Sequence, residues 1–240
     1  MIRSLLIYTQ FFTRIPVPLT IDLSYIRTGV PFLSLFGLLL GCLWSSLFLL
    51  LTSVLPSSLS LVVLLFFDVL LTGGFHMDAL ADTADGLFSS RKPERMLEIM
   101  KDSRMGTNGV LALIFFYLLF VAAFWEQKFI DWQVLLMLAT ISKAGLAIQV
   151  WKLRDARAHT GSGNFFQGAK GHHIVLAQAL PIGLSFYFFQ NKGLIAYASF
   201  LVGALLYRRF VYRKIGGQTG DTLGAYALLG QLCYLLGLVI

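Results

Sequence analysis

The chain has 240 residues, of which 57% are hydrophobic and 13% are charged. Soluble domains carry about 25% charged residues, so this composition excludes an ordinary soluble domain and a disordered chain and indicates an integral membrane protein. The formal net charge is +7. Both cysteines lie in apolar runs, so no disulfide framework or thiolate zinc site is expected. The N-terminal segment lacks the cleavage site of a signal peptide.

Seven apolar segments are candidates for membrane-spanning helices, because about 20 mostly apolar residues cross a bilayer core about 30 Å thick. The segments cover approximately residues 32–55, 59–75, 109–125, 132–151, 174–190, 193–207 and 222–240. The fifth and sixth are separated by Asn191, Lys192 and Gly193, which predicts a tight hairpin. We therefore expect an all-α, polytopic membrane helical bundle that forms one domain over residues 1–240.

The positive charges gather on one side of this predicted topology. All but three of the 19 Lys and Arg residues lie before the first span or directly after the second, fourth and sixth spans; the exceptions are Lys128, Lys143 and Lys192. The positive-inside rule then predicts a cytoplasmic N-terminus. Polar loops at approximately residues 76–108, 152–173 and 208–221 share this cytoplasmic face. Because the topology accounts for the positive charge, no nucleic-acid partner is expected.

The most polar stretch contains Asp78, Asp82 and Asp85. Their spacing of four and three residues places the carboxylates on one face of a helix. Such a group repels unless a cation neutralises it, and its hard oxygen ligands suit Mg²⁺ or Mn²⁺, which share coordination with substrate phosphates. The alternative is a solvated polar helix whose dipole favours aspartates in its first turn.

A second polar stretch interleaves acidic and basic residues. Its candidate functional residues are Lys101, Asp102, Arg104, Gly106 and Gly109. Lysine and arginine side chains can reach phosphate oxygens, and a turn flanked by glycines can bring backbone N–H groups close to phosphate. The alternative is an amphipathic surface helix with ordinary ion pairs.

Three further charges lie outside these stretches. Asp221 precedes the last span, where it is either a helix N-cap or part of the functional site. Asp68 and Lys143 lie within predicted spans, where charges indicate function by default, although Lys143 also suits the bundle interior. Serine-hydrolase, zinc-protease, Walker and Rossmann motifs are absent. The remaining interpretation is carboxylate–metal phosphoryl chemistry at a membrane face.

Three long motifs, taken in this order, resemble the cobalamin synthase family, the adenosylcobinamide-GDP ribazoletransferases. They are GGFHMDALADTADG at residues 73–86, MKDSRMGTNG at residues 100–109 and GGQTGDTLGA at residues 216–225. The likeness extends to residues 12–18, which include Arg14, and to the loop at residues 161–165, which includes Asn164. The family often carries acidic residues shortly after the third motif, where this chain has Leu228 and Gln231.

The resemblance implies a transferase of the bacterial cytoplasmic (inner) membrane. A hydroxyl of α-ribazole, or of α-ribazole 5′-phosphate, would attack the cobinamide-linked phosphorus of adenosylcobinamide-GDP. GMP would leave, and adenosylcobalamin or its 5′-phosphate would form as the last assembly step of the nucleotide loop. A magnesium ion, with manganese as the alternative, would bridge phosphate oxygens.

The resemblance also implies roles for individual residues. The expected metal ligands are Asp78, Asp82, Asp85 and Asp102, of which Asp82, Asp85 and Asp102 are also expected catalytic residues. His76 is expected to carry a proton or, equally, to make a structural hydrogen bond. The expected substrate contacts are Lys101, Arg104, Gly106, Asp221, Arg14 and Asn164.

Two other functional classes share part of this pattern. The CDP-alcohol phosphotransferases have a signature that begins like Asp82-Thr-Ala-Asp85-Gly86, but its later glycine and aspartates do not follow here. A transporter would also have several spans with charges inside them, but its polar groups usually lie near the membrane midplane. The sequence carries no prediction of oligomeric state.

Overall fold

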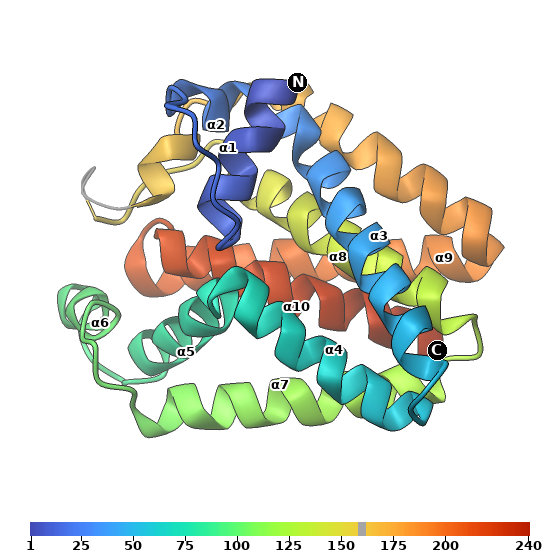
Figure 1. The fold of residues 1–240 in the computed structure, drawn as a ribbon. Coiled ribbons are helices and arrows are strands. Elements are labelled where there is room, and N and C mark those ends of the chain that lie inside the picture. The colour runs from blue at the N-terminus through green and yellow to red at the C-terminus, as the bar shows by residue number, and fades with distance from the viewer. Residues whose placement is uncertain (158–161) are drawn as a thin grey trace.

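The computed structural model describes residues 1–157 and 162–240, and within these ranges the chain forms helices and no β-strand. Figure 1 shows the helices packed as one bundle with α8 and α10 in its middle. The helices are α1 (Ile2–Phe12), α2 (Ser24–Thr28), η1 (Val30–Phe32), α3 (Leu33–Thr52), α4 (Ser57–Thr72), α5 (Phe75–Leu87), α6 (Pro93–Ile99), α7 (Thr107–Glu126), α8 (Asp131–Gln149), η2 (Ser162–Phe166), α9 (Gly171–Ile215) and α10 (Gly220–Val239).

Helices α8 and α10 are the most buried, with 78% of the apolar window of each inside the bundle. Two glycines one turn apart bring α3 against α8. A Cβ atom on Gly37 would lie 2.6 Å from the carbonyl oxygen of Ala139, and one on Gly41 would lie 2.5 Å from that of Leu136. Small residues at this spacing let membrane helices pack with their backbones close together.

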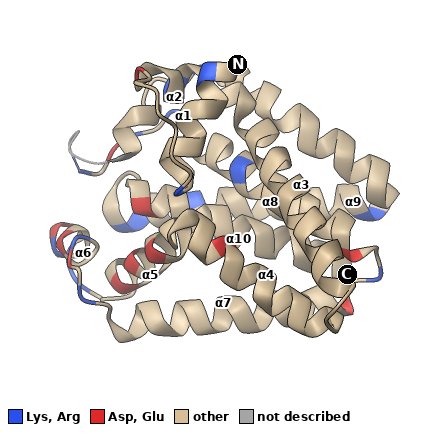
Figure 2. Ribbon diagram, viewed as in Figure 1, with Lys and Arg blue, Asp and Glu red and all other residues tan. Residues whose placement is uncertain are grey.

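The outer helices expose large apolar side chains. Leu50 on α3, Phe66 on α4 and Phe115 on α7 have 67%, 62% and 58% of their surface exposed. Figure 2 shows that α3 and α7 carry almost no charge along their length. A surface of this kind is stable in hydrocarbon and not in water. The predicted polytopic membrane helical bundle is therefore confirmed.

By length and composition, five helices of the described chain are able to cross a membrane, and the bent pair α4–α5 makes a sixth. Helix α9 enters this count once, although its backbone leaves the helical conformation at Gln190. Its two halves fold back on each other, since the Tyr197 hydroxyl donates to the Gln178 side chain at 2.9 Å. The predicted hairpin is thus confirmed, and the number of crossings stays a prediction.

The predicted second span is interrupted. Helix α4 ends at Thr72, and α5 continues from Phe75 at an angle of 88°. Gly73 and Gly74 form the bend with φ of +69° and +71°, a left-handed conformation that glycine adopts without steric cost. The predicted boundary at residue 75 is therefore wrong, and the bend turns the aspartate helix α5 away from the axis of α4.

The predicted loop at residues 208–221 is also too long, because α9 continues to Ile215. The last turns of α9 are anchored to the bundle: Arg208 donates to the Gln149 carbonyl at 2.8 Å, and Tyr207 donates to the Thr222 carbonyl at 2.7 Å. Gly216, with φ of +71°, ends the helix. The connection to α10 therefore consists of residues 216–219.

The predicted orientation is testable by cysteine labelling on a background without Cys42 and Cys233. A membrane-impermeant maleimide should label Ser57→Cys in intact cells and should leave Ser89→Cys unlabelled, because positive loops stay inside. Permeabilised cells should show label at both positions. Labelling of Ser89→Cys in intact cells would contradict a cytoplasmic N-terminus.

Candidate active site

The aspartate helix α5 packs against the start of α10. Gly224 permits this contact, since a Cβ atom there would lie 2.7 Å from the Cβ of Ala79. The two helices run antiparallel, because later residues of α10 lie beside the beginning of α5 and the end of α4. Asp221 precedes Gly224 by three residues, and Asp82 follows Ala79 by three. The contact therefore brings Asp82 and Asp221 to the same end of the helix pair.

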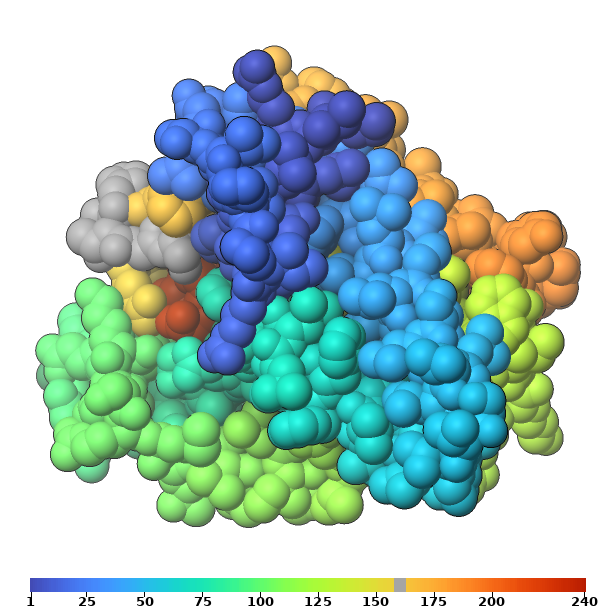
Figure 3. Space-filling view, in the orientation of Figure 1, coloured from blue at the N-terminus to red at the C-terminus, as the bar shows by residue number. Residues whose placement is uncertain are grey.

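Asp78, Asp82 and Asp221 together form what we call the carboxylate site. Asp78 is exposed, whereas Asp82 and Asp221 are partly buried. The charges of Asp78 and Asp221 both act on Asp82. Figure 2 shows acidic positions, coloured red, along the α5 ribbon, and Figure 3 shows the start of α10 at the surface between α5 and η2. The predicted helix is confirmed, and the site gains an aspartate from α10.

Arg157 brings a positive charge to the carboxylate site. Its Nη2 atom donates to Oδ2 of Asp221 at 2.7 Å, and its side chain is 10% exposed. The loop before it is held by Gln218, whose N–H donates to the Arg154 carbonyl at 2.8 Å and whose carbonyl accepts from the Ala156 N–H at 2.9 Å. Our sequence interpretation did not include Arg157, because the pairing of these two loops is not visible in either segment alone.

The N-cap of α10 is Thr219, so the N-cap interpretation of Asp221 is wrong. The Thr219 hydroxyl accepts from the Thr222 N–H at 3.2 Å, and the Thr222 hydroxyl accepts from the Thr219 N–H at 2.8 Å. This reciprocal pair is a capping box and satisfies two N–H groups at the helix start. Asp221, in the first turn, is left to pair with Arg157.

Asp85 faces the start of α7 and caps that helix. Its carboxylate accepts from the N–H groups of Gly106 and Gly109, at 2.7 and 2.8 Å, and the side chain is buried. A Cβ atom on either glycine would lie 2.5 Å from a carboxylate oxygen of Asp85. Both glycines are therefore needed for the close approach. The Gly106 N–H that we expected to face phosphate donates to Asp85 instead.

We expect Asp85→Ala to destabilise the protein by about 1–3 kcal/mol, because two N–H groups at the start of α7 lose charge-assisted bonds. Asp85→Asn keeps one acceptor and should destabilise less. Thermal unfolding in detergent measures both effects. If Asp85→Asn unfolds at the native temperature yet loses turnover, Asp85 would be a ligand rather than a cap.

Asp102 and Arg104 form an exposed ion pair in the loop before α7. Arg104 Nε lies 3.0 Å from Asp102 Oδ1, and Nη2 lies 2.6 Å from Oδ2. Hydrogen bonds from Arg104 lower the pKa of the Asp102 carboxyl to about 2. A carboxylate with this pKa is a weak base. Lys101 is exposed beside the pair, so both cations are accessible to a phosphate.

His76 and Arg14 both lie at the α4–α5 bend. His76 is 6% exposed, stacks on Phe12 with ring centres 5.6 Å apart, and places Nε2 3.4 Å from the Nζ atom of Lys143. The Arg14 guanidinium covers Gly73, where a Cβ atom would lie 2.6 Å from Nε. The contact that the structure gives His76 is therefore with Lys143 and not with an aspartate.

The segment η2 closes another side of the carboxylate site. A Cβ atom on Gly163 would lie 3.3 Å from the Gly220 nitrogen, which places Asn164 beside the start of α10. The Asn164 Oδ1 atom is buried and has no hydrogen-bond partner among the described residues. Gly161, at the start of this motif, lies outside the described residues.

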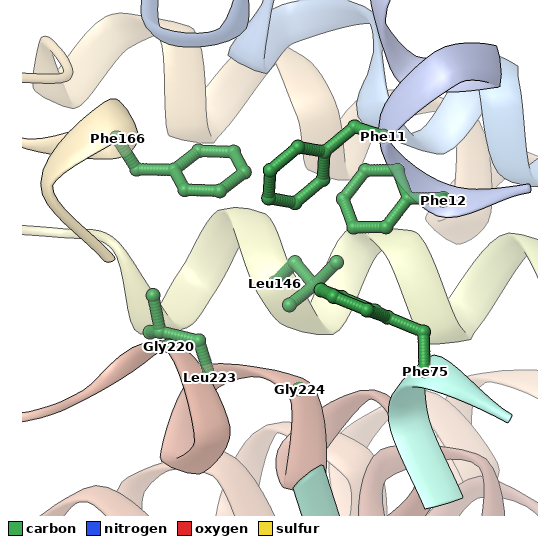
Figure 4. Close-up of a pocket in the computed structure, with 8 residues that line it drawn as sticks. All are labelled: Phe11, Phe12, Phe75, Leu146, Phe166, Gly220, Leu223 and Gly224. Carbon is green, nitrogen blue, oxygen red and sulfur yellow. The ribbon is translucent and has the colours of Figure 1, made fainter. Parts of the chain in front are cut away.

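An aromatic cluster adjoins this end of α10. It surrounds a small cavity of about 10 Å³. Figure 4 shows the lining residues, which are Phe11, Phe12, Phe75, Leu146, Phe166, Gly220, Leu223 and Gly224. The rings come from α1, α5 and η2, three segments that are distant in sequence. These apolar rings border the start of α10.

The structure does not bring the four predicted metal ligands together. Within residues 1–157 and 162–240, no group of three or more His, Cys, Asp or Glu side chains is placed to hold a metal ion. Asp85 and Asp102 are engaged elsewhere, which leaves Asp78 and Asp82 as neighbours one turn apart on α5. Magnesium is commonly held by one or two carboxylates plus substrate phosphates. This donor pair therefore fits a magnesium ion shared with a phosphate substrate.

Comparison with known proteins identifies the family. The family model described as cobalamin-5-phosphate synthase (CobS) matches residues 4–239. The chain belongs to the cobalamin-5-phosphate synthase family. This membership favours the family resemblance over the CDP-alcohol phosphotransferase and transporter alternatives.

Individual relatives of this cobalamin-5-phosphate synthase family member are similar along its whole length. A protein of Listeria monocytogenes serotype 4a (strain HCC23), named adenosylcobinamide-GDP ribazoletransferase, is 42% identical over 99% of this chain and 98% of its own length. Proteins with the same name from Clostridium novyi (strain NT) and Clostridium botulinum (strain 657 / Type Ba4) are 34% and 36% identical, over 99% and 100% of this chain and 96% and 98% of their own lengths. No solved structure matches the chain.

Leu228 and Gln231, where the cobalamin-5-phosphate synthase family often carries acidic residues, face the bundle interior. They are 4% and 3% exposed, and Gln231 donates to the Leu138 carbonyl at 3.1 Å. Both line a small cavity with Asp68 and Lys143. Neither residue is therefore one of the side chains that form the carboxylate site.

Proposed function

We propose that the chain transfers the cobinamide phosphoryl group of adenosylcobinamide-GDP to α-ribazole or α-ribazole 5′-phosphate and releases GMP, at the carboxylate site. The observation that carries the proposal is the grouping of Asp78, Asp82 and Asp221 with Arg157 at one end of a membrane bundle. The names of the full-length relatives describe the same transfer. Phosphoryl transfer depends mainly on charge neutralisation and alignment, which these residue types supply.

In this reaction the acceptor hydroxyl oxygen forms a bond to the cobinamide-linked phosphorus. The bond from that phosphorus to the bridging oxygen breaks, and GMP leaves with the bridging oxygen. When substrate binds, the ion pair between Arg157 and Asp221 opens. The Arg157 guanidinium then binds phosphate oxygens through two parallel hydrogen bonds. Asp221, released from Arg157, takes the proton of the acceptor hydroxyl.

Magnesium, or manganese in its place, is part of this proposal, with Asp78 and Asp82 as its protein ligands. When bound, the ion neutralises charge on the pyrophosphate. Treatment with EDTA should therefore lower turnover at least about 100-fold, and added Mg²⁺ should restore it. GMP release at the full rate after chelation would contradict a metal requirement.

We place the carboxylate site at the cytoplasmic face of the bacterial inner membrane. The excess of Lys and Arg on the same side as the site supports this orientation. Nucleotide-activated substrates are also found in the cytosol. The lipid bilayer is then a partner in addition to the two substrates.

Purified protein in detergent, incubated with adenosylcobinamide-GDP, Mg²⁺ and either acceptor, tests the proposal by chromatographic measurement of GMP. We expect GMP to appear together with adenosylcobalamin or its 5′-phosphate, and the faster of the two acceptors identifies the substrate. Adenosylcobinamide-GDP alone should release no GMP. Release without an acceptor would indicate a hydrolase, and no release with either acceptor would contradict the proposed transfer.

A further inference from the structure

Three ionisable side chains meet inside the bundle, behind the carboxylate site. They are Asp68 on α4, His76 on α5 and Lys143 on α8. Lys143 is 3% exposed, its Nζ atom lies 3.4 Å from Nε2 of His76, and its charge interacts with that of Asp68. All three line a cavity of about 20 Å³. We call these three residues the bend cluster.

The bend cluster is costly to bury, because a charge inside a protein needs partners that replace water. Asp68 and Lys143 are not within 4.0 Å of each other, since no such ion pair occurs among the described residues. The cavity between them is large enough for one water, which needs about 10–15 Å³. Trp44 also lines this cavity, and its indole group interacts with the Asp68 carboxylate.

The position of the bend cluster indicates what these buried charged groups contribute to the structure. Asp68 precedes the glycine bend at residues 73–74 and His76 follows it. Lys143, on a third helix, contacts His76 on one arm and interacts through its charge with Asp68 on the other. Phe12 covers the same group, since its ring centre lies 4.5 Å from the Lys143 Nζ atom. Glycines with positive φ permit the bend but do not fix its angle. Contacts from outside the bend are needed to hold it.

We infer that Lys143 is a positioning residue for the phosphoryl transfer. Through its contact with His76 and its charge interaction with Asp68, it fixes α5 relative to α4 and thereby places Asp78 and Asp82 against Asp221. This inference rests on the proposed function. A displacement of about 1 Å at a reacting centre costs about 100-fold in rate, so loss of Lys143 acts on the rate of transfer although it does not touch the substrate.

The test compares variants of the full chain in detergent. Lys143→Met removes the charge and keeps the length of the side chain, Lys143→Arg keeps the charge, and Asp68→Asn removes the opposite charge. The control is Ser185→Ala, which loses a buried 2.9 Å bond to the Tyr234 hydroxyl in the distant α9 hairpin. Each variant is assayed for kcat and KM of GMP release, and its thermal unfolding is recorded.

A distance measurement reports the bend directly. Spin labels on Leu59→Cys and Phe88→Cys, two exposed positions at the far ends of α4 and α5, give the distribution of distances across the bend by pulsed electron resonance. The labelled protein lacks Cys42 and Cys233. This readout does not depend on turnover, so it separates failure of the inference from failure of the proposed function.

We expect Lys143→Met to lower kcat about 100-fold and to broaden the distance distribution, with KM for adenosylcobinamide-GDP changed by less than about twofold. Lys143→Arg should retain most of the native kcat, and Ser185→Ala should match the native protein in kcat and in distance. If Lys143→Met does not fold, the Asp68→Asn variant is used to test the inference instead. A lowered kcat together with a broadened distance distribution in that variant supports the inference. A native kcat in the folded charge-removing variant, or a lowered kcat with an unchanged distribution, overturns it.

Discussion

Asp82→Asn is expected to lower kcat for GMP release by about 10²–10⁴-fold with little change in folding. Asparagine keeps the shape of the side chain and removes the charge at the centre of the carboxylate site. The charges of Asp78 and Asp221 both act on Asp82, so loss of the Asp82 charge relieves repulsion in the substrate-free protein. The fall in rate should therefore not be accompanied by destabilisation.

The measurement for Asp82→Asn is kcat together with the unfolding temperature in detergent. Glu126→Gln is a matched control, because it neutralises an exposed carboxylate at the opposite end of α7. This control should retain the native rate. Turnover of Asp82→Asn within about threefold of the native protein would reject Asp82 as part of the catalytic site.

Arg157→Met is expected to lower kcat by about 10³-fold, the range measured when an arginine that stabilises phosphoryl transfer is lost. Arg157 is the cation that pairs with Asp221 in the substrate-free structure. Its guanidinium suits two phosphate oxygens at once, whereas lysine offers a point charge. Arg157→Lys should therefore recover part of the rate lost in Arg157→Met.

Arg154→Met is the control for this prediction, since Arg154 is exposed, lies in the same loop and contributes a backbone hydrogen bond with Gln218. We expect its kcat to match that of the native protein. Equal losses in Arg154→Met and Arg157→Met would assign the effect to the loop rather than to the Arg157 charge. A native kcat in Arg157→Met would contradict its proposed contact with phosphate.

Local periodicity was sufficient to predict much of the fold. The apolar runs predicted the long helices because burial in a bilayer requires them, and the spacing of the aspartates predicted α5. The bend at Gly73 and Gly74 was missed, because an apolar run that continues to Phe75 has the same composition whether or not the helix is broken. Glycine permits the bend, but contacts from α8 and α1 accompany it, and these are not local in sequence.

The site was predictable in its chemistry but not in its pairings. Asp85 has the same spacing as the other aspartates, yet its partners are two N–H groups more than 20 residues away. Arg157 joined the site through the pairing of two loops whose sequences do not indicate contact. Side-chain type limits what a residue can bind, whereas tertiary packing decides which of those partners it meets.

The capping of α7 by Asp85 couples two parts of the molecule mechanically. The carboxylate ties α5 to Gly106, and Gly106 directly follows the loop that carries Asp102 and Arg104. A force on that loop is transmitted through a buried, charge-assisted contact to the helix that carries Asp82. A bound diphosphate that draws Arg104 inward would therefore shift Asp82 with it, so that the two regions respond to substrate as one unit.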